Sequence, residues 1–180
     1  ELTSLLCRDA LLGYATPEVS EANVSERTIT FAVPVAEGYG ISPLANMERN
    51  FDVCRDFACQ FSRGGGDQLL SGGTGLGKTF LSACIARTVS QRGYSVAYDS
   101  AGAALAAFER EKFSRDADEV SAASATVKHY LNCDLMILDD LGTEMNTAFT
   151  QSALYTIINQ RLTAGRPTII STNLTESALE

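Results

Sequence analysis

The sequence has 180 residues, a length that suits one well-buried domain. With 45% hydrophobic and 20% charged residues, it has the composition of a soluble globular protein. Its formal net charge of -8 argues against a domain that holds nucleic acid by bulk electrostatics alone, although a local basic patch or an oligomer stays compatible with that charge. No apolar run approaches the roughly 20 residues of a membrane span, and no leader pattern is seen, so we expect a cytoplasmic protein without membrane contact.

The first forty residues mix turn formers and β-branched residues without a sustained period. This pattern predicts a short helix near Leu2–Leu12 followed by an extended arm, together a segment over residues 1–41. A regular core is predicted over residues 42–180. It opens with Ser42-Pro43, a serine cap followed by a proline at the first helical position, and apolar residues then recur at helical spacing until the three glycines at 64–66.

After residue 66, short apolar runs alternate with helical segments. The third and fourth runs are almost entirely apolar, as expected when helices cover both faces of a parallel sheet. Gly93 and Gly165 stand where C-terminal helix caps belong. The alternation predicts an α/β fold with a mostly parallel sheet flanked by helices. The predicted strands are Gln68–Ser71, Ser95–Tyr98, Leu135–Leu138 and Thr168–Ser171, and the predicted helices are Lys78–Arg92, Ala101–Lys112, Glu119–Leu131 and Ala148–Thr163.

The turn between the first strand and its helix is rich in glycine and fits the pattern G-x-x-x-x-G-K-[ST] in full. Such a loop points its backbone N–H groups at a triphosphate, and the positive N-terminal end of the next helix adds to them. We expect Lys78 to place its charge at the β- and γ-phosphates, and the Thr79 hydroxyl to ligate Mg²⁺. The predicted ATP-binding residues are Gly72, Gly73, Thr74, Gly75, Leu76, Gly77, Lys78, Thr79 and Phe80.

The apolar run at Leu135–Leu138 ends in two carboxylates, Asp139 and Asp140. Because the carboxyl ends of parallel strands line the ligand crevice of an open sheet, both acids are expected beside the glycine loop. Two acids there would be costly without a cation between them. We predict that Asp139 holds Mg²⁺, directly or through water, and that Asp140 orients the attacking water.

Asn173 follows the last predicted strand, at the same edge of the sheet. A neutral polar side chain there offers a hydrogen bond to the γ-phosphate or to the lytic water. A strand-end asparagine in a turn is the plainer alternative. Because the glycine loop and the acidic pair are also present, we favour the phosphate-sensing role for Asn173. The predicted catalytic residues are therefore Lys78, Asp140 and Asn173.

The five cysteines are scattered and form no CxxC pair. The closest two, Cys54 and Cys59, have no second pair to complete a zinc site, and the lone histidine, His129, lies far from them in the sequence. We therefore expect buried, reduced thiols and assign no role to His129.

Together these motifs resemble the P-loop ATPases of the AAA+ class, and among them the bacterial replicative helicase loaders of the DnaC and DnaI type. The transposition helper ATPases of the IstB type share much of the same sequence. The resemblance implies a Walker A loop, a Walker B doublet in place of the common Asp-Glu, and sensor 1 at Asn173. It rests on GGTGLGKTFLSACIA at Gly72–Ala86, LNCDLMILDDLGTE at Leu131–Glu144, INQR at Ile158–Arg161 and PTIISTNL at Pro167–Leu174.

The resemblance also implies a fifth core strand, an arginine finger and a helical lid, none of which this sequence matches. We therefore expect a core truncated before the last strand and lid, which binds nucleotide better than it hydrolyses it. Arg161 has two interpretations, a solvated cation at a helix end or an intersubunit contact. Glu144 is either a residue that reports the nucleotide state or a plain loop carboxylate.

The resulting hypothesis is a Mg²⁺- and ATP-dependent ATPase that assists DNA replication by loading a hexameric replicative helicase onto single-stranded DNA. We also expect the chain to self-associate with ATP and, because it is acidic, to bind DNA only weakly in isolation. The alternatives are a transposition helper and a nucleotide-dependent binding module with little hydrolysis. A P-loop kinase would need a basic lid and an acceptor pocket, and the sequence shows neither. The interior cations that could touch DNA are Arg110, Lys112, Arg115 and Lys128.

Overall fold

A computed structural model describes residues 43–142 and 147–174 of the chain. The helix and arm predicted over residues 1–41, the cap at Ser42 and the loop residue Glu144 lie outside these ranges. Within them, strands and helices alternate as the sequence predicts. The elements are α3 (Pro43–Gln60), β1 (Gln68–Ser71), α4 (Lys78–Gln91), β2 (Val96–Ser100), α5 (Ala101–Phe113), α6 (Ala117–Asn132), β3 (Leu135–Leu141), α7 (Ala148–Thr163) and β4 (Thr168–Thr172).

Two element boundaries differ from the prediction in an informative way. Helix α6 begins two residues earlier than expected, because the Asp116 side chain accepts hydrogen bonds from the backbone N–H groups of Asp118 and Glu119 and so caps the helix. Strand β2 continues to Ser100, which lies opposite Asp139 in the ladder with β3. Pairing with a neighbouring strand therefore extends β2 beyond its own apolar run.

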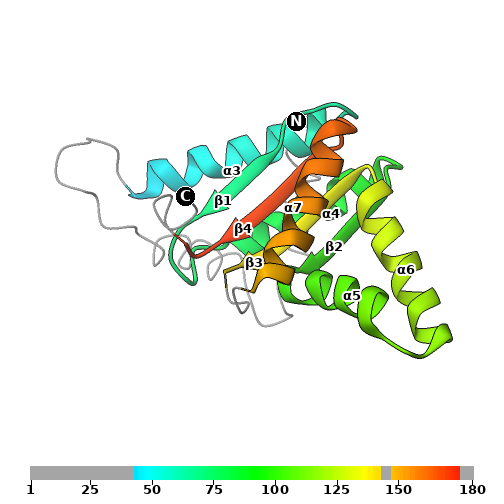
Figure 1. Ribbon diagram of the computed structural model, residues 1–180. Coiled ribbons are helices and arrows are strands. Elements are labelled where there is room, and N and C mark those ends of the chain that lie inside the picture. The colour runs from blue at the N-terminus through cyan, green and yellow to red at the C-terminus, as the bar shows by residue number, and fades with distance from the viewer. Residues whose placement is uncertain (1–42, 143–146, 175–180) are drawn as a thin grey trace, which may run out of the picture.

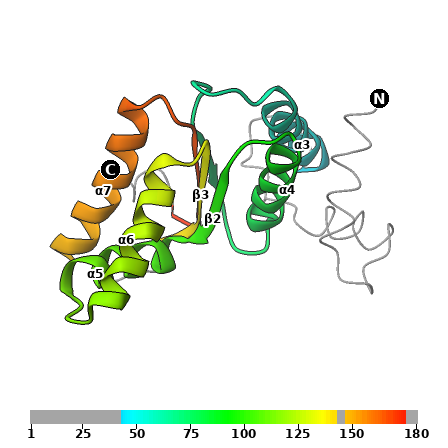
Figure 2. The same cartoon turned by 90° about the vertical axis from the view of Figure 1, so that its right-hand side faces the viewer.

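The four strands form one parallel sheet in the order β1-β4-β3-β2 (Figure 1). Strand β3 lies inside the sheet, between β4 and β2. Helices α3 and α4 cover one face, and α5, α6 and α7 cover the other, which gives three layers (Figure 2). This arrangement confirms the predicted α/β fold with helices on both sides of a parallel sheet.

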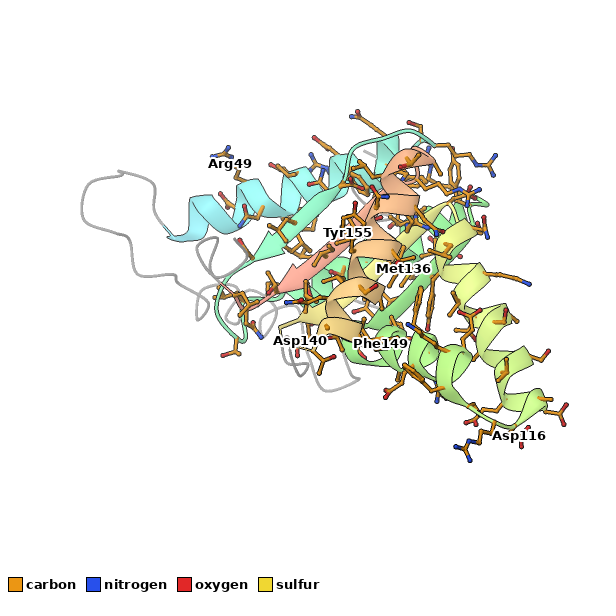
Figure 3. The ribbon with its side chains drawn as sticks, in the orientation of Figure 1. Arg49, Asp116, Met136, Asp140, Phe149 and Tyr155 are labelled. Carbon is orange, nitrogen blue, oxygen red and sulfur yellow. The ribbon has the colours of Figure 1, made fainter. Side chains whose placement is uncertain are left out.

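Alternate residues of β3 build the two halves of the core. Leu135 and Ile137 pack with the apolar residues of α3 and α4, whereas Met136 and Leu138 pack toward α5, α6 and α7. All four side chains are buried, and Figure 3 shows Met136 beside α7. A strand covered on both faces must be apolar throughout, which explains the unbroken run LMIL before the acids.

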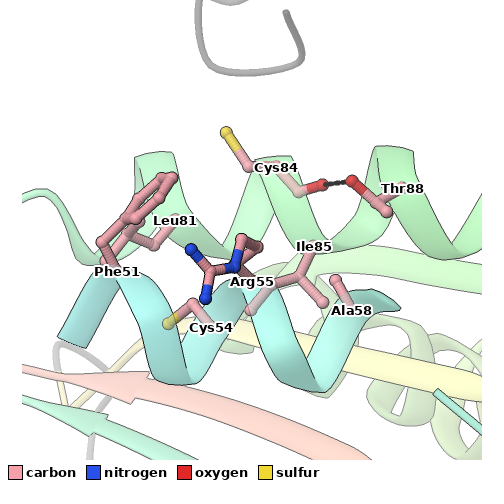
Figure 4. A pocket seen from close by; sticks show the side chains of 8 residues that line it. All are labelled: Phe51, Cys54, Arg55, Ala58, Leu81, Cys84, Ile85 and Thr88. Carbon is pink, nitrogen blue, oxygen red and sulfur yellow. Dashed lines mark hydrogen bonds between the residues drawn. The ribbon is translucent and has the colours of Figure 1, made fainter. Parts of the chain in front are cut away.

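A small apolar hollow lies between α3 and α4 (Figure 4). Cys54 and Cys84 are both buried on its wall, and burial raises the pKa of the Cys54 thiol to about 11. Cys59 is half-buried, and Cys133 is buried on the other side of the sheet. These four cysteines form no disulfide, and three of them are buried as predicted, whereas Cys59 is not fully buried. None of the helices that the structure describes is both long and apolar enough to cross a membrane.

Candidate nucleotide-binding site

The glycine-rich loop connects β1 to α4 at the carboxyl edge of the sheet. Its first residue, Gly72, donates its backbone N–H to the carbonyl of Thr172, at the end of β4, over 3.3 Å. Gly72 has a φ of 146°, and a Cβ there would lie 2.9 Å from a methyl carbon of Leu76. Gly77 has a φ of 84° at the N-cap of α4. Both positions therefore favour glycine, and α4 begins at Lys78 with its N-terminal end facing the loop.

Lys78 is held by three acceptors at this edge. Its Nζ donates to the carbonyl oxygens of Gly72 and Gly73, each at 2.8 Å, and to Oδ1 of Asn173 at 2.7 Å. Partial burial lowers the pKa of the Lys78 ammonium, and the nearby carboxylates of Asp140 and Asp139 oppose that shift. The structure thus joins the predicted Walker A lysine to the predicted sensor asparagine, although 95 residues separate them in the sequence.

Asn173 continues this chain of hydrogen bonds to Asp140. Its Nδ2 donates to Oδ1 of Asp140 at 2.8 Å. The backbone of Asp140 has a φ of 58°, the left-handed conformation, which aspartate tolerates better than most residues. The ladder between β3 and β4 shifts its register between Leu138 and Leu141, so Asp140 lies in a local irregularity of the strand. This conformation accompanies the contact between the Asp140 carboxylate and Asn173.

Asp139 is only 8% exposed, and both of its carboxylate oxygens accept hydroxyl hydrogen bonds. Ser171, on β4, donates to Oδ1, and Tyr98, on β2, donates to Oδ2 over 2.8 Å. The Ser171 hydroxyl also accepts the backbone N–H of Asp140 at 2.9 Å. The two neighbouring strands therefore hold the acid from both sides, which offsets the cost of burying its charge.

Sequence reasoning missed Tyr98 and Ser171 as site residues. Both lie at the carboxyl ends of predicted strands, which was a usable signal, but the sequence does not say which strands lie beside β3. That neighbourhood follows from the strand order. The remaining loop residues lie where the motif predicts: Thr74 and Gly75 are exposed in the loop, and Thr79 and Phe80 are in the first turn of α4, with Thr79 exposed and Phe80 half-buried.

The oxygen atoms at this edge of the sheet are of the kind that Mg²⁺ binds. The described residues hold no group of three or more His, Cys, Asp or Glu side chains that could enclose a metal by themselves. Mg²⁺ does not need such a cage, since it keeps several waters and binds through one or two protein oxygens plus substrate phosphates. The Tyr98 hydroxyl contacts the Asp139 carboxylate at 2.8 Å and lies 3.5 Å from the carbonyl of Thr79. The Asp139 carboxylate and the first turn of α4, which carries Thr79, therefore both lie within reach of the Tyr98 hydroxyl, and an aspartate with a nearby threonine is a donor set that Mg²⁺ accepts.

Both sequence interpretations of Arg161 are wrong. Its residue exposure is 0%, so it is neither a solvated cation nor a residue that can reach another subunit, and its side chain bonds to groups of α6, β4 and the segments beside them. The guanidinium donates to the carbonyl oxygens of Tyr130 and Pro167, each at 2.7 Å. Arg161 therefore connects the end of α6 to the start of β4 and has a structural role.

The four candidate cations for DNA contact lie at the C-terminal end of α5, in the turn that follows it and on α6. Lys112 stands near two aromatic rings, with Nζ 5.5 Å from the ring centre of Phe113 and 5.3 Å from that of Phe149. Phe149 lies in the first turn of α7, next to α5 in Figure 3. Arg110, Arg115 and Lys128 are exposed.

Solved structures share this fold at low sequence identity. The DnaC helicase loader superposes with a TM-score of 0.62 at 22% identity, and the match covers 79% of this chain and 79% of that one. DnaI gives 0.60 at 20% identity, over 76% of this chain and 69% of the other. The replication initiator DnaA bound to AMPPCP and single-stranded DNA gives 0.61 at 21% identity, over 73% of this chain and 40% of the initiator. This chain therefore spans less than half of that initiator's length.

No curated protein matches the sequence. The profile of the IstB-like ATP binding protein family matches residues 52–178, which is most of the chain and includes the glycine loop, both acids and Asn173. The fold and the motif positions agree with that match. The chain therefore belongs to the IstB-like ATP-binding family and has the AAA+ fold.

Proposed function

We propose that this chain is the core of a Mg²⁺-dependent ATPase and that the site at the carboxyl edge of the sheet hydrolyses ATP. The observation that carries the proposal is the hydrogen-bonded chain from Lys78 through Asn173 to Asp140. It links a phosphate-binding cation, a phosphate-sensing amide and a carboxylate that can orient water, three groups that phosphoryl transfer to water requires. A purely structural role for these groups would not require them to meet at the glycine loop.

In this proposal, most of the catalytic work is positioning and charge stabilisation. Lys78 exchanges its contacts with the Gly72 and Gly73 carbonyls for oxygens of the β- and γ-phosphates. Asn173 contacts the γ-phosphate while it keeps the Asp140 carboxylate in place. Asp140 accepts a hydrogen bond from the attacking water and aligns it. Mg²⁺, when bound near Thr79 and Asp139, supplies positive charge to the phosphates.

We further propose that this ATPase loads a hexameric replicative helicase onto single-stranded DNA and self-associates with ATP. Two solved structures with the same fold are described as the DnaC helicase loader and DnaI, and a third is an initiator bound to single-stranded DNA. At such identities the likeness supports this biology only through the fold. The exposed cations around α5 and α6 are the candidates for DNA contact.

A second candidate function is that of a helper ATPase in transposition. The family match favours it, because the family takes its name from the IstB type. Both candidates use the same nucleotide site and differ in the protein partner. A pull-down with the replicative helicase and with a transposase of the host distinguishes them, because each candidate predicts capture of one partner and not of the other.

Calorimetric titration with ATP and Mg²⁺ tests the nucleotide site itself. Lys78→Ala should remove most of the affinity while the circular dichroism spectrum stays unchanged, because the lysine supplies charge and packs little. Lys128→Ala removes an exposed lysine on α6 and is the matched control, with no expected effect. Equal affinities of the wild type and Lys78→Ala would reject the site. Binding without turnover would favour the nucleotide-dependent binding module over the ATPase.

A further inference from the structure

Tyr98 is the central residue of β2, and its hydroxyl reaches forward to the acid of the neighbouring strand β3. The hydroxyl donates to Oδ2 of Asp139 at 2.8 Å and lies 3.5 Å from the carbonyl oxygen of Thr79, in the first turn of α4. A phenol has one proton to donate, and the shorter contact assigns it to Asp139. Tyr98 thus stands between the glycine-loop helix and the strand that carries the acid.

Ser171 makes the matching contact from the other side. Its hydroxyl is buried, donates to Oδ1 of Asp139 and accepts the backbone N–H of Asp140. Each carboxylate oxygen of Asp139 therefore has a hydroxyl donor, one from β2 and one from β4. Two donors on opposite oxygens fix the rotation of the carboxylate about its terminal bond, which is a broad and soft torsion when no partner holds it.

From this geometry we propose that Tyr98 is a positioning residue for the divalent cation, and that Ser171 shares this role. The inference rests on the proposed function, since it concerns how tightly the same site holds Mg²⁺ once nucleotide is bound. With both oxygens already accepting hydroxyl hydrogen bonds, Asp139 presents its remaining lone pairs in one orientation to the metal or to a metal-bound water. Outer-shell partners of this kind orient metal-binding groups and tune metal affinity.

The hydroxyl of Tyr98 can be removed by substitution without creating a cavity in the hydrophobic core. The residue is 39% exposed, so Tyr98→Phe deletes one hydroxyl at the edge of the sheet and leaves the ring. Asp139 then loses the donor on Oδ2 and its carboxylate rotates more freely. A hydrogen bond to a charged group changes an equilibrium by about tenfold, and partial exposure reduces this, so we expect an increase of about fivefold to tenfold in the half-saturating Mg²⁺ concentration.

The experiment measures binding of a fluorescent ATP analogue while Mg²⁺ is titrated, with the full chain as wild type, Tyr98→Phe and Ser171→Ala. Tyr155→Phe is the matched control, because Tyr155 is 68% exposed on α7, away from the glycine loop (Figure 3). We expect the half-saturating Mg²⁺ concentration to rise in Tyr98→Phe and Ser171→Ala and to stay unchanged in Tyr155→Phe. Binding of the analogue in EDTA should be the same for the wild type and Tyr98→Phe, which separates metal positioning from a general loss of structure.

A second readout uses Mn²⁺ in place of Mg²⁺, with electron paramagnetic resonance to count the bound metal in the nucleotide complex. Tyr98→Phe should weaken Mn²⁺ binding by the same factor. An unchanged or lower requirement for the divalent cation in Tyr98→Phe would overturn the inference and leave the proposed function intact. If the wild type itself bound the analogue without any dependence on Mg²⁺, the proposed function would fail first. Should Ser171→Ala not fold, Tyr98→Phe still decides the outcome.

Discussion

The guanidinium of Arg161, on α7, donates to the backbone carbonyl oxygen of Tyr130, on α6, at 2.7 Å, and both residues are buried. The same NH1 group reaches the carbonyl of Cys133 at 3.0 Å, and NH2 reaches that of Pro167 at 2.7 Å. Burial lowers the pKa of the Arg161 guanidinium. The side chain thus donates several hydrogen bonds to backbone carbonyls at the C-terminal end of α6 and just before β4.

Arg161→Met should therefore destabilise the fold by about 3 kcal/mol or more, because several hydrogen bonds from a charged donor to buried groups are lost at once. Urea unfolding followed by circular dichroism measures the change in the free energy of unfolding. Arg166→Met is the matched control: Arg166 is half-buried and its NH1 donates to the carbonyl of Leu131 and to Oδ1 of Asn132. We expect the control to lose about 1 kcal/mol. Similar losses for both variants would contradict the structural role of Arg161.

A second prediction concerns the stability of the fold at low pH. Hydrogen bonds from the Arg63 guanidinium, and then from the backbone and hydroxyl of Ser95, hold the pKa of the Asp134 carboxyl well below its usual range. A depressed folded-state pKa contributes stability that is present above the unfolded value, about 3.9, and is lost as the pH falls through the folded-state value. The free energy of unfolding should therefore fall between about pH 5 and about pH 2 more steeply in the wild type than in Asp134→Asn.

Urea unfolding at several pH values within this window checks the prediction. Asp118→Asn, which changes an exposed acid on α6, is the charge-matched control and should keep the slope of the wild type. If Asp134→Asn showed the same pH dependence as the wild type, the contact between Arg63 and Asp134 would contribute nothing to acid stability.

Substitutions of the two neighbouring acids, Asp139 and Asp140, should have different effects on ATP hydrolysis. Asp140→Asn keeps an oxygen that can accept from Nδ2 of Asn173, so the network survives while the charge is lost. We expect Mg·ATP binding to persist and turnover to fall by about a hundredfold in the assembled protein, because the water loses the carboxylate that aligns it. Asp139→Asn should instead raise the Mg²⁺ concentration needed for turnover. Phosphate release over a Mg²⁺ titration measures both effects, and unchanged turnover in both variants would remove the acidic pair from the site.

The isolated chain should bind single-stranded DNA weakly and with strong salt dependence. Its net charge of -8 opposes the phosphate neutralisation that supplies most non-specific affinity. The available cations are few, and Lys112 lies over the Phe113 and Phe149 rings. Fluorescence anisotropy with a labelled oligonucleotide at two salt concentrations tests this prediction. Nanomolar binding by the nucleotide-free chain at both concentrations would refute the charge argument.

Much of this protein follows from the sequence by itself. Three features of the site are local: the glycine loop, the acids after an apolar strand and the start of the helix at Lys78. Each can be recognised from fewer than about ten neighbouring residues. The alternation of strand and helix predicted the α/β fold, because hydrophobic periodicity depends on the faces that an element buries. Strand β1 and helix α7 begin and end where the sequence predicts.

The tertiary structure alone decided which distant residues meet. Ser100 lies opposite Asp139, and so Tyr98 reaches that acid from β2 while Ser171 reaches it from β4. Such contacts depend on strand order and register, which local patterns along one segment do not record. The burial of Arg161 has the same origin: a cation near a helix end is exposed by default, and only the packing of α6 and β4 around it encloses the guanidinium and gives it backbone acceptors.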